Sequence, residues 1–441
     1  MKTILTIATS LFFLTNISFA QDFGEFRLDG DGISVPVPEK SAVEKTVNLP
    51  EIKPTPMKEW TVMVFMNGKN SLESEAIGDL IEMGRVGSNS NVNIIVELGR
   101  IKEQKDNTSN DVCIGTNIFY IGKNYKISCG KRIIPAQKIA SLPKVNMGDS
   151  REVSNFVLWA KKYFPARKYM LVIWDHGSGW EKGNPVIAKG ISDDEETGNN
   201  ISTPQLGEIV QKIGDIEVLS FDACLMQMAE VIYEIKDGKV KYLTASEEIE
   251  PGSGYPYDKI LFQLVSNPSM EGNQLSKIIV DEYIKSTKIP TATHSAIDMS
   301  KASILIEKMN VFAKAAMASK EKAVIKAAKD SAKKYGPYHT IKYGTIIHRD
   351  LKDFVNIVAK NSKDEKLNAA AKEISDFISI GQLLVENKAN DIGSNGVAVN
   401  MDILSEDYAE LKIAKETQFD EFITWLLKYN VIVPFSNQNG W

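Results

Sequence analysis

The sequence is poor in the two residue types that most often hold transition metals. Its 441 residues include three cysteines and four histidines, with no Cys-x-x-Cys or His-x-x-x-His pair. Zinc sites in proteins commonly use such closely spaced pairs. The composition therefore gives no support for a zinc centre, and we expect His294, His339 and His348 to be structural or surface residues.

The sequence also lacks a strong charge of one sign and long apolar runs. The formal net charge is −5, and lysine and arginine are scattered along the chain. A nucleic-acid-binding surface needs a basic cluster, and a membrane-spanning helix needs about 20 consecutive apolar residues. We therefore expect no nucleic-acid partner and no membrane span.

The N-terminus has three features of an export signal. Lys2 is positively charged, Ile4–Leu14 is apolar, and Ser18 and Ala20 are the small residues of a cleavage site. A membrane anchor or a buried strand is the alternative, although this apolar run is short and interrupted by polar residues. We predict that residues 1–20 are a bacterial-type Sec signal peptide and that the protein is secreted or periplasmic.

Two of the three cysteines flank a predicted hairpin. Cys113 and Cys129 lie on either side of residues 114–128. A disulfide between them suits an oxidising compartment, while two reduced buried thiols remain the alternative. Cys224 is then the odd cysteine, which in an exported protein is an intermolecular partner or a reactive thiol.

The chain divides by pattern into three further parts. Residues 21–57 are polar and proline-rich, which predicts a pro-segment or linker. Residues 58–261 alternate short apolar strands with amphipathic helices, as in a parallel α/β sheet. Residues 262–441 are mainly helical by period. We expect an α/β fold with a mostly parallel sheet and a helical C-terminal region packed on it. Strands are expected at 60–66, 92–98, 169–174, 217–221, 242–246 and 396–401, and helices at 71–85, 152–163, 204–212, 225–236, 303–334, 350–360, 365–386 and 418–429.

Two predicted strands end in turns with reactive side chains. His176 follows the strand at 169–174, and Cys224 follows the strand at 217–221. Because parallel strands end at the same edge of a sheet, a histidine and a thiol there can meet for nucleophilic catalysis. The predicted helix directly after Cys224 would favour its thiolate. His176 would be the general base, and its alternative is a turn histidine bonded to the backbone.

Glycine follows the histidine. Gly177 has no Cβ, so its N–H could join that of Cys224 in an oxyanion hole. A serine hydrolase is not supported around Ser178, because His176 stands where a nucleophile elbow needs glycine.

Together these segments resemble the clostripain family of cysteine peptidases, from about Trp60 to Leu261. The segments that carry the resemblance are 155–161, 174–180, 192–195, 221–230 and 245–258. The resemblance implies a caspase-like α/β/α sandwich, a dyad of Cys224 and His176, and cleavage after arginine or lysine. Asp222 then selects the basic residue, since a carboxylate pairs well with a guanidinium, and an N-cap role is its alternative. Glu247 and Glu248 are alternative pocket acids.

The resemblance also implies an inactive precursor that is cut between the two turns. Within the loop 181–202 we favour self-cleavage after Lys189, which would leave a two-chain enzyme. Asp193, Asp194 and Glu195 are candidate Ca²⁺ ligands, with a solvated acidic loop as the alternative. No cofactor is expected to be required for the chemistry. One departure from the family is the turn 68–71, Gly-Lys-Asn-Ser, where an acidic residue and two asparagines are usual.

These observations lead to two hypotheses. The first is an exported, monomeric cysteine endopeptidase acting on proteins or peptides with arginine or lysine before the scissile bond. The second is a non-catalytic secreted binding protein that retains the fold. A Cys-His acyltransferase is a third, which would ligate rather than hydrolyse.

Overall fold

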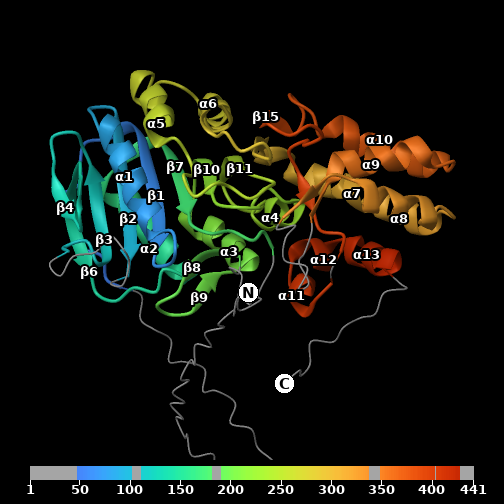
Figure 1. Ribbon diagram of the computed structural model, residues 1–441, viewed down its shortest axis with the longest axis horizontal. Coiled ribbons are helices and arrows are strands. Elements are labelled where there is room, and N and C mark those ends of the chain that lie inside the picture. The colour runs from blue at the N-terminus through green and yellow to red at the C-terminus, as the bar shows by residue number, and fades with distance from the viewer. Residues whose placement is uncertain (1–46, 102–110, 181–189, 337–347, 403, 428–441) are drawn as a thin grey trace, which may run out of the picture. The chain divides into compact units, whose positions relative to one another are not determined.

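A nine-stranded sheet is the centre of the described part of the chain, residues 47–101, 111–180, 190–336, 348–402 and 404–427 of this computed structural model (Figure 1). Its order is β15-β12-β11-β10-β7-β1-β2-β3-β6. The five central strands are parallel, and the two outer strands on each side pair antiparallel. In this order the strands span Leu384–Ala389, Thr293–Asp298, Val240–Ala245, Ile216–Asp222, Ala166–Trp174, Lys58–Gly68, Val92–Arg100, Gly115–Ile121 and Ala136–Leu142.

The central strands are apolar because both of their faces are covered. β2 is buried along its whole length, whereas the edge strand β6 is mostly half-buried or exposed. Alternate residues of β7 face two separate cores, with Ile173 in one and Val172 in the other. The predicted α/β class with a mostly parallel sheet is confirmed.

Helices cover both faces of this sheet. One core is closed by α1 (Glu73–Val86), α5 (Tyr257–Ser266) and α6 (Gly272–Ser286). The other is closed by α2 (Ser150–Tyr163), α3 (Thr203–Ile213) and α4 (Ala229–Glu234). The result is three layers, helices over sheet over helices.

The C-terminal region continues the second core. It consists mainly of helices, as expected, but its strands β12 and β15 extend the large sheet. The described residues between 47 and 427 form one compact unit with no division near 261. After α6, the described helices of the C-terminal region are α7 (Ala302–Ala318), α8 (Lys322–Ser331), α9 (Leu351–Asn361), α10 (Glu365–Phe377), α11 (Glu406–Ala409), α12 (Lys412–Glu416) and α13 (Phe419–Leu427), with a 3₁₀ turn at Met299–Lys301. A small sheet joins β13 (Lys334–Tyr335), β14 (His348–Asp350) and β16 (Ala398–Val399).

Three helix predictions are wrong in extent. The helix expected at 303–334 is two helices, interrupted at 319–321. The one expected at 365–386 ends at Phe377 and gives way to β15. The one expected at 225–236 begins only at Ala229, which changes the surroundings of the preceding cysteine.

The described end of the predicted linker packs along α2. The Trp159 indole donates to the carbonyl of Pro50 (2.7 Å), and the N–H of Thr55 donates to the carbonyl of Tyr163 (2.9 Å). The predicted signal peptide lies outside the described residues, as does the rest of the linker up to residue 46. Among the helices that are described, none has the length and hydropathy required to cross a bilayer.

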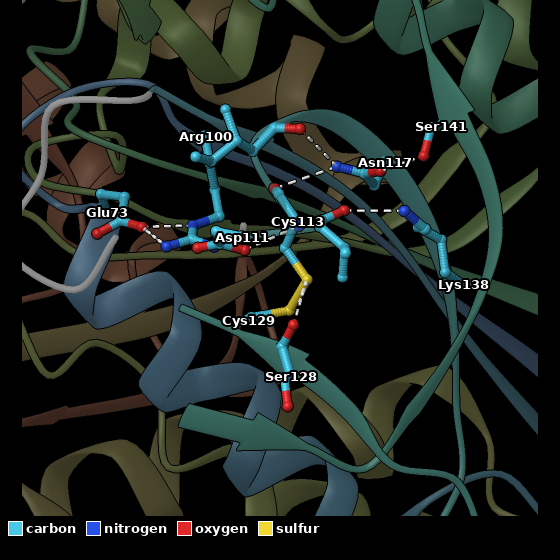
Figure 2. Close-up of a disulfide and its surroundings, with 11 residues drawn as sticks. Glu73, Arg100, Asp111, Cys113, Asn117, Ser128, Cys129, Lys138 and Ser141 are labelled. Atoms are coloured by element: carbon cyan, nitrogen blue, oxygen red, sulfur yellow. Dashed lines mark hydrogen bonds and ion pairs between the residues drawn. A yellow bond between two sulfur atoms is a disulfide. The ribbon is translucent and has the colours of Figure 1, made fainter. Parts of the chain in front are cut away.

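Cys113 and Cys129 form a disulfide with their Cα atoms 5.2 Å apart (Figure 2). Cys129 ends the short strand β4 (Ile127–Cys129), which pairs with β5 (Arg132–Ile134). Beside the disulfide, the buried Arg100 guanidinium pairs with Asp111 (2.7 Å) and with Glu73 of α1. These two ion pairs connect the end of β2 to α1 and to the segment that leads from Asp111 to the disulfide.

Candidate active site

The two reactive turns lie side by side, as the strand pattern predicts. β7 and β10 are parallel neighbours, with Trp174 opposite Asp222 at their carboxyl ends. The next turns touch closely: a Cβ on Gly177 would lie 2.4 Å from the carbonyl oxygen of Cys224. No other residue fits this approach without moving the backbone. The histidine and cysteine turns are therefore packed against one another.

His176 is held from the turn after β1. The ring nitrogen Nε2 lies 3.0 Å from the hydroxyl of Ser71. The main-chain N–H of His176 donates to the Asp175 carboxylate (2.6 Å). The Asn70 amide also donates to Asp175 and to the carbonyl of Asp193 (2.9 Å). The turn that departs from the family pattern thus still contributes side chains to the site.

The imidazole is neutral at rest. Burial lowers the pKa of His176 below its usual value, and the nearby carboxylates of Asp193 and Glu75 only partly oppose this shift. A neutral ring can accept a proton from a thiol.

The thiol of Cys224 interacts with Glu250 in this arrangement. Its Sγ accepts a hydrogen bond from the Glu250 N–H (3.3 Å) and lies 3.8 Å from the Glu250 carbonyl oxygen, to which it donates. Desolvation and the Glu250 carboxyl raise the pKa of Cys224 to about 12. The expected thiolate-favouring surroundings are therefore absent, because α4 begins at Ala229 and not at the cysteine.

A strained turn replaces the expected helix start. Leu225 has φ 62°, a left-handed conformation that a leucine rarely adopts. Its N–H donates to the carbonyl of Glu248 (3.2 Å), and the Gln227 N–H donates to the carbonyl of Ser246 (2.9 Å). The residues after the cysteine are thus bonded to segment 246–250 rather than to a helix.

Asp222 is buried at the end of β10. Its carboxylate accepts hydrogen bonds from the Tyr257 hydroxyl (2.8 Å) and the Tyr255 N–H (3.4 Å). Burial raises the pKa of Asp222 to about 6. The N-cap alternative is wrong, since α4 starts seven residues further on.

Glu250 is a site residue that sequence reasoning missed. Its buried carboxyl lies against Asp222 and 3.6 Å from Nδ1 of His294, and burial together with Asp222 raises its pKa well above the usual value. The expected alternatives lie elsewhere. Glu248 accepts from the Gly336 N–H (3.1 Å), and burial beside Asp350 raises the pKa of Glu247. Three glutamates within four positions gave no local signal of which one meets Asp222.

The three candidate Ca²⁺ ligands do not converge. Asp194, in β8 (Ile191–Asp194), is buried and accepts from the N–H groups of Met147 (2.8 Å) and Thr197 (3.0 Å). Asp193 lies on the His176 side, and the Glu195 side chain is largely exposed. Across the described ranges, no group of three His, Cys, Asp or Glu side chains is placed to hold a metal ion. Lys189 lies outside these ranges.

Comparisons with known proteins identify the family. Residues 64–441 match the model of the clostripain family. The chain belongs to this family of cysteine peptidases. Clostripain from Hathewaya histolytica is 32% identical over 219 residues, which is 45% of this chain and 41% of clostripain. The match thus spans less than half the length of that relative.

Two solved structures share the fold. A secreted C11 cysteine protease from Bacteroides thetaiotaomicron, in complex with an irreversible peptide inhibitor, is 20% identical with a TM-score of 0.55, covering 85% of this chain and 100% of that one. An inactive zymogen C11 protease from Parabacteroides distasonis is 18% identical with a TM-score of 0.58, covering 83% and 99%. The predicted caspase-like sandwich is confirmed by these likenesses.

Proposed function

We propose that this protein is an exported cysteine endopeptidase that hydrolyses peptide bonds after arginine or lysine, with Cys224 as nucleophile and His176 as general base. The observation that carries the proposal is the packing of Gly177 on the Cys224 carbonyl, which joins the two turns. Family membership supports the reaction class.

In the proposed mechanism, the imidazole of His176 takes the proton of the Cys224 thiol. The thiolate attacks the scissile carbonyl carbon, and the N–H groups of Gly177 and Cys224 stabilise the resulting oxyanion. His176 then protonates the leaving amine, and water hydrolyses the thioester. No step requires a metal ion or another cofactor.

The described arrangement corresponds to a resting state. His176 is bonded to Ser71, and the thiol is bonded to the main chain of Glu250. For catalysis, the Cys224 thiol must leave the main chain of Glu250 and approach the imidazole of His176. This requirement supports a precursor that becomes active on cleavage after Lys189. That loop ends beside the histidine turn, where the Gly190 N–H donates to the Ser178 hydroxyl (2.7 Å).

The basic preference is proposed to come from Asp222. Its desolvated carboxylate, with the Glu250 carboxyl beside it, would pair strongly with a guanidinium or ammonium. Substrates are therefore expected to be proteins and peptides with arginine or lysine before the cleaved bond.

The test is hydrolysis of a peptide library by the chain lacking residues 1–20 and by its Cys224→Ala variant. Cleavage confined to basic residues, blocked by thiol alkylation and absent in the variant, is expected. Cleavage after other residues would sink the assignment of Asp222. Equal activity of both proteins would contradict the assignment of Cys224 as the nucleophile. Binding of peptides without cleavage, after the chain is cut at Lys189, would favour the non-catalytic hypothesis.

A further inference from the structure

The side chain of Lys69 lies in the acidic loop that was a candidate calcium site. Lys69 follows β1, and its side chain is 1% exposed. Its Nζ lies 2.7 Å from a carboxylate oxygen of Glu196 and 3.5 Å from one of Asp194, and it donates to the carbonyl of Val145. A buried ammonium is thus surrounded by three oxygens of the kind that bind Ca²⁺.

The main chain of Lys69 holds the same loop. Its carbonyl accepts from the Glu195 N–H (3.1 Å), and its own N–H donates to the Asn67 amide oxygen (3.0 Å). The aliphatic stem packs closely on β2, where a Cβ on Gly99 would come within 3.2 Å of the Lys69 Cγ. The ammonium is therefore fixed in position rather than free to leave.

Other acids also depend on this charge. The Lys69 ammonium lowers the pKa of the buried Glu97, against the larger opposing effects of burial and Glu152. Among the described residues, Lys69 is the cation that pairs with Asp194, whose side chain is 0% exposed, and removing the ammonium would remove that pairing. A divalent ion at the same oxygens would be repelled by the ammonium at contact distance.

We infer that Lys69 is a built-in cation that takes the place of Ca²⁺ in the loop 193–197. The ammonium neutralises Asp194 and Glu196, so the loop that borders His176 is ordered without a metal. Asn70, the next residue, then reaches Asp175 and the Asp193 carbonyl. The chain accordingly needs no calcium for stability or for the geometry of this turn.

The first test is thermal unfolding of the purified protein during titration with CaCl₂ and, separately, with EGTA. The melting temperature Tm is expected to stay unchanged in both. A saturable rise of Tm with CaCl₂, or a fall with EGTA, would overturn the inference. This readout is independent of peptidase activity, so it does not depend on the proposed function.

The second test compares two lysines that contact the same carboxylate. Lys144 pairs with Glu196 from outside (3.6 Å) and its side chain is 66% exposed. Lys69→Met is expected to lower Tm by about 5 °C, with partial recovery in millimolar CaCl₂, because the buried Asp194 carboxylate loses the ammonium that pairs with it. Lys144→Met is expected to change Tm by less than about 1 °C and to show no calcium response. Equal Tm values for the two variants would contradict the inference.

A double variant keeps the inference testable if Lys69→Met folds poorly. In Lys69→Met/Asp194→Asn neither buried charge remains, so Tm is expected to lie above that of Lys69→Met. A double variant that is less stable than the single one would show that the pair is not a charge-compensating unit.

Discussion

Asp222 and Glu250 form a buried pair of carboxyl groups beside the Cys224 turn. Burial raises both pKa values, and the negative charge of Asp222 further raises the pKa of Glu250, so the pair resists carrying two negative charges. A basic side chain of a substrate would supply the positive charge that the pair lacks. At the scale of single residues, this buried pair is the basis of the proposed preference for arginine or lysine.

This pair gives a prediction on specificity. Asp222→Asn is expected to lower kcat/KM for an arginine or lysine substrate about 100-fold, because the cation would be desolvated without its partner. In the unmodified protein the same kcat/KM should fall as the pH drops below about 6, where Asp222 becomes protonated. Peptide hydrolysis from pH 5 to 8 measures both effects. Glu247→Gln, equally buried but facing Asp350, is the control, and an equal loss there would contradict the assignment.

Gly177 gives a second prediction at this scale. Gly177→Ala would put a methyl group 2.4 Å from the Cys224 carbonyl oxygen, so the two turns must separate. We expect kcat/KM to fall at least about 100-fold, with a smaller effect on Tm. Gly78→Ala is the control, because its added Cβ would have only a side-chain nitrogen of Arg132 nearby, at 3.9 Å. Unchanged hydrolysis by Gly177→Ala would contradict the assignment of the Gly177 N–H to the oxyanion hole.

Segment 246–250 connects the nucleophile turn with the C-terminal region. On one side it accepts hydrogen bonds from Leu225 and Gln227. On the other, Glu248 accepts from Gly336, and the N–H of Glu247 donates to the Thr293 hydroxyl (3.0 Å). At the scale of elements, freeing the Cys224 thiol therefore requires segment 246–250 to move, and this segment is also hydrogen-bonded to the C-terminal region.

Helix α4 offers a measurable link between the same two regions. The buried Glu230 carboxylate accepts from the Asn400 N–H (3.0 Å) and the Tyr408 hydroxyl (3.3 Å), and burial raises its pKa to about 7. The folded chain binds this proton more tightly than the unfolded chain, where the pKa is about 4.5. The stability that Glu230 contributes is therefore complete below pH 4.5 and is lost as the pH rises through 7.

Glu230→Gln is expected to remove this pH dependence. Glutamine stays neutral and retains the acceptor oxygen, so the variant should be more stable than the unmodified protein at pH 8.5, by up to about 3 kcal/mol, and similar to it at pH 5. Urea unfolding at the two pH values measures the difference. Glu248→Gln, whose side chain is less deeply buried, is the comparison. A variant that is less stable at both pH values would mean that Glu230 acts as a charged acceptor.

The sequence was sufficient where neighbouring residues determine the structure. The central strands have continuous apolar runs, and parallel pairing then brings the turns of His176 and Cys224 together. Glu250 could not be found in this way, because its meeting with Asp222 depends on how segment 246–250 folds back. The helix predicted at 365–386 extends into the first three residues of the edge strand β15, which is half-polar and only partly buried. The left-handed Leu225 likewise depends on contacts with Glu248 that lie far along the chain.

At the scale of the whole molecule, the loop between the two turns is the point where one cut could change the site. Its described end is fixed: the Ser178 N–H donates to the Gly190 carbonyl (2.9 Å), next to His176. Cleavage after Lys189 would replace the Gly190 amide by a charged amine beside the Ser178 hydroxyl, which now accepts from it. The new charge would lie beside Ser178, two residues after His176, the proposed general base.

The prediction is that the purified protein converts itself at this bond. Incubation at pH 8 should yield a chain that begins at Gly190, identified by N-terminal sequencing, and hydrolysis of a lysine substrate should rise in step with its appearance. Cys224→Ala should stay intact alone and be cut when a trace of active protein is added. Lys189→Ala should stay uncut there and keep its thiol slow to alkylate, since Glu250 still holds it. Full activity of an uncut Lys189→Ala chain would show that substrate alone displaces Glu250, and that the resting contact is not relieved by processing.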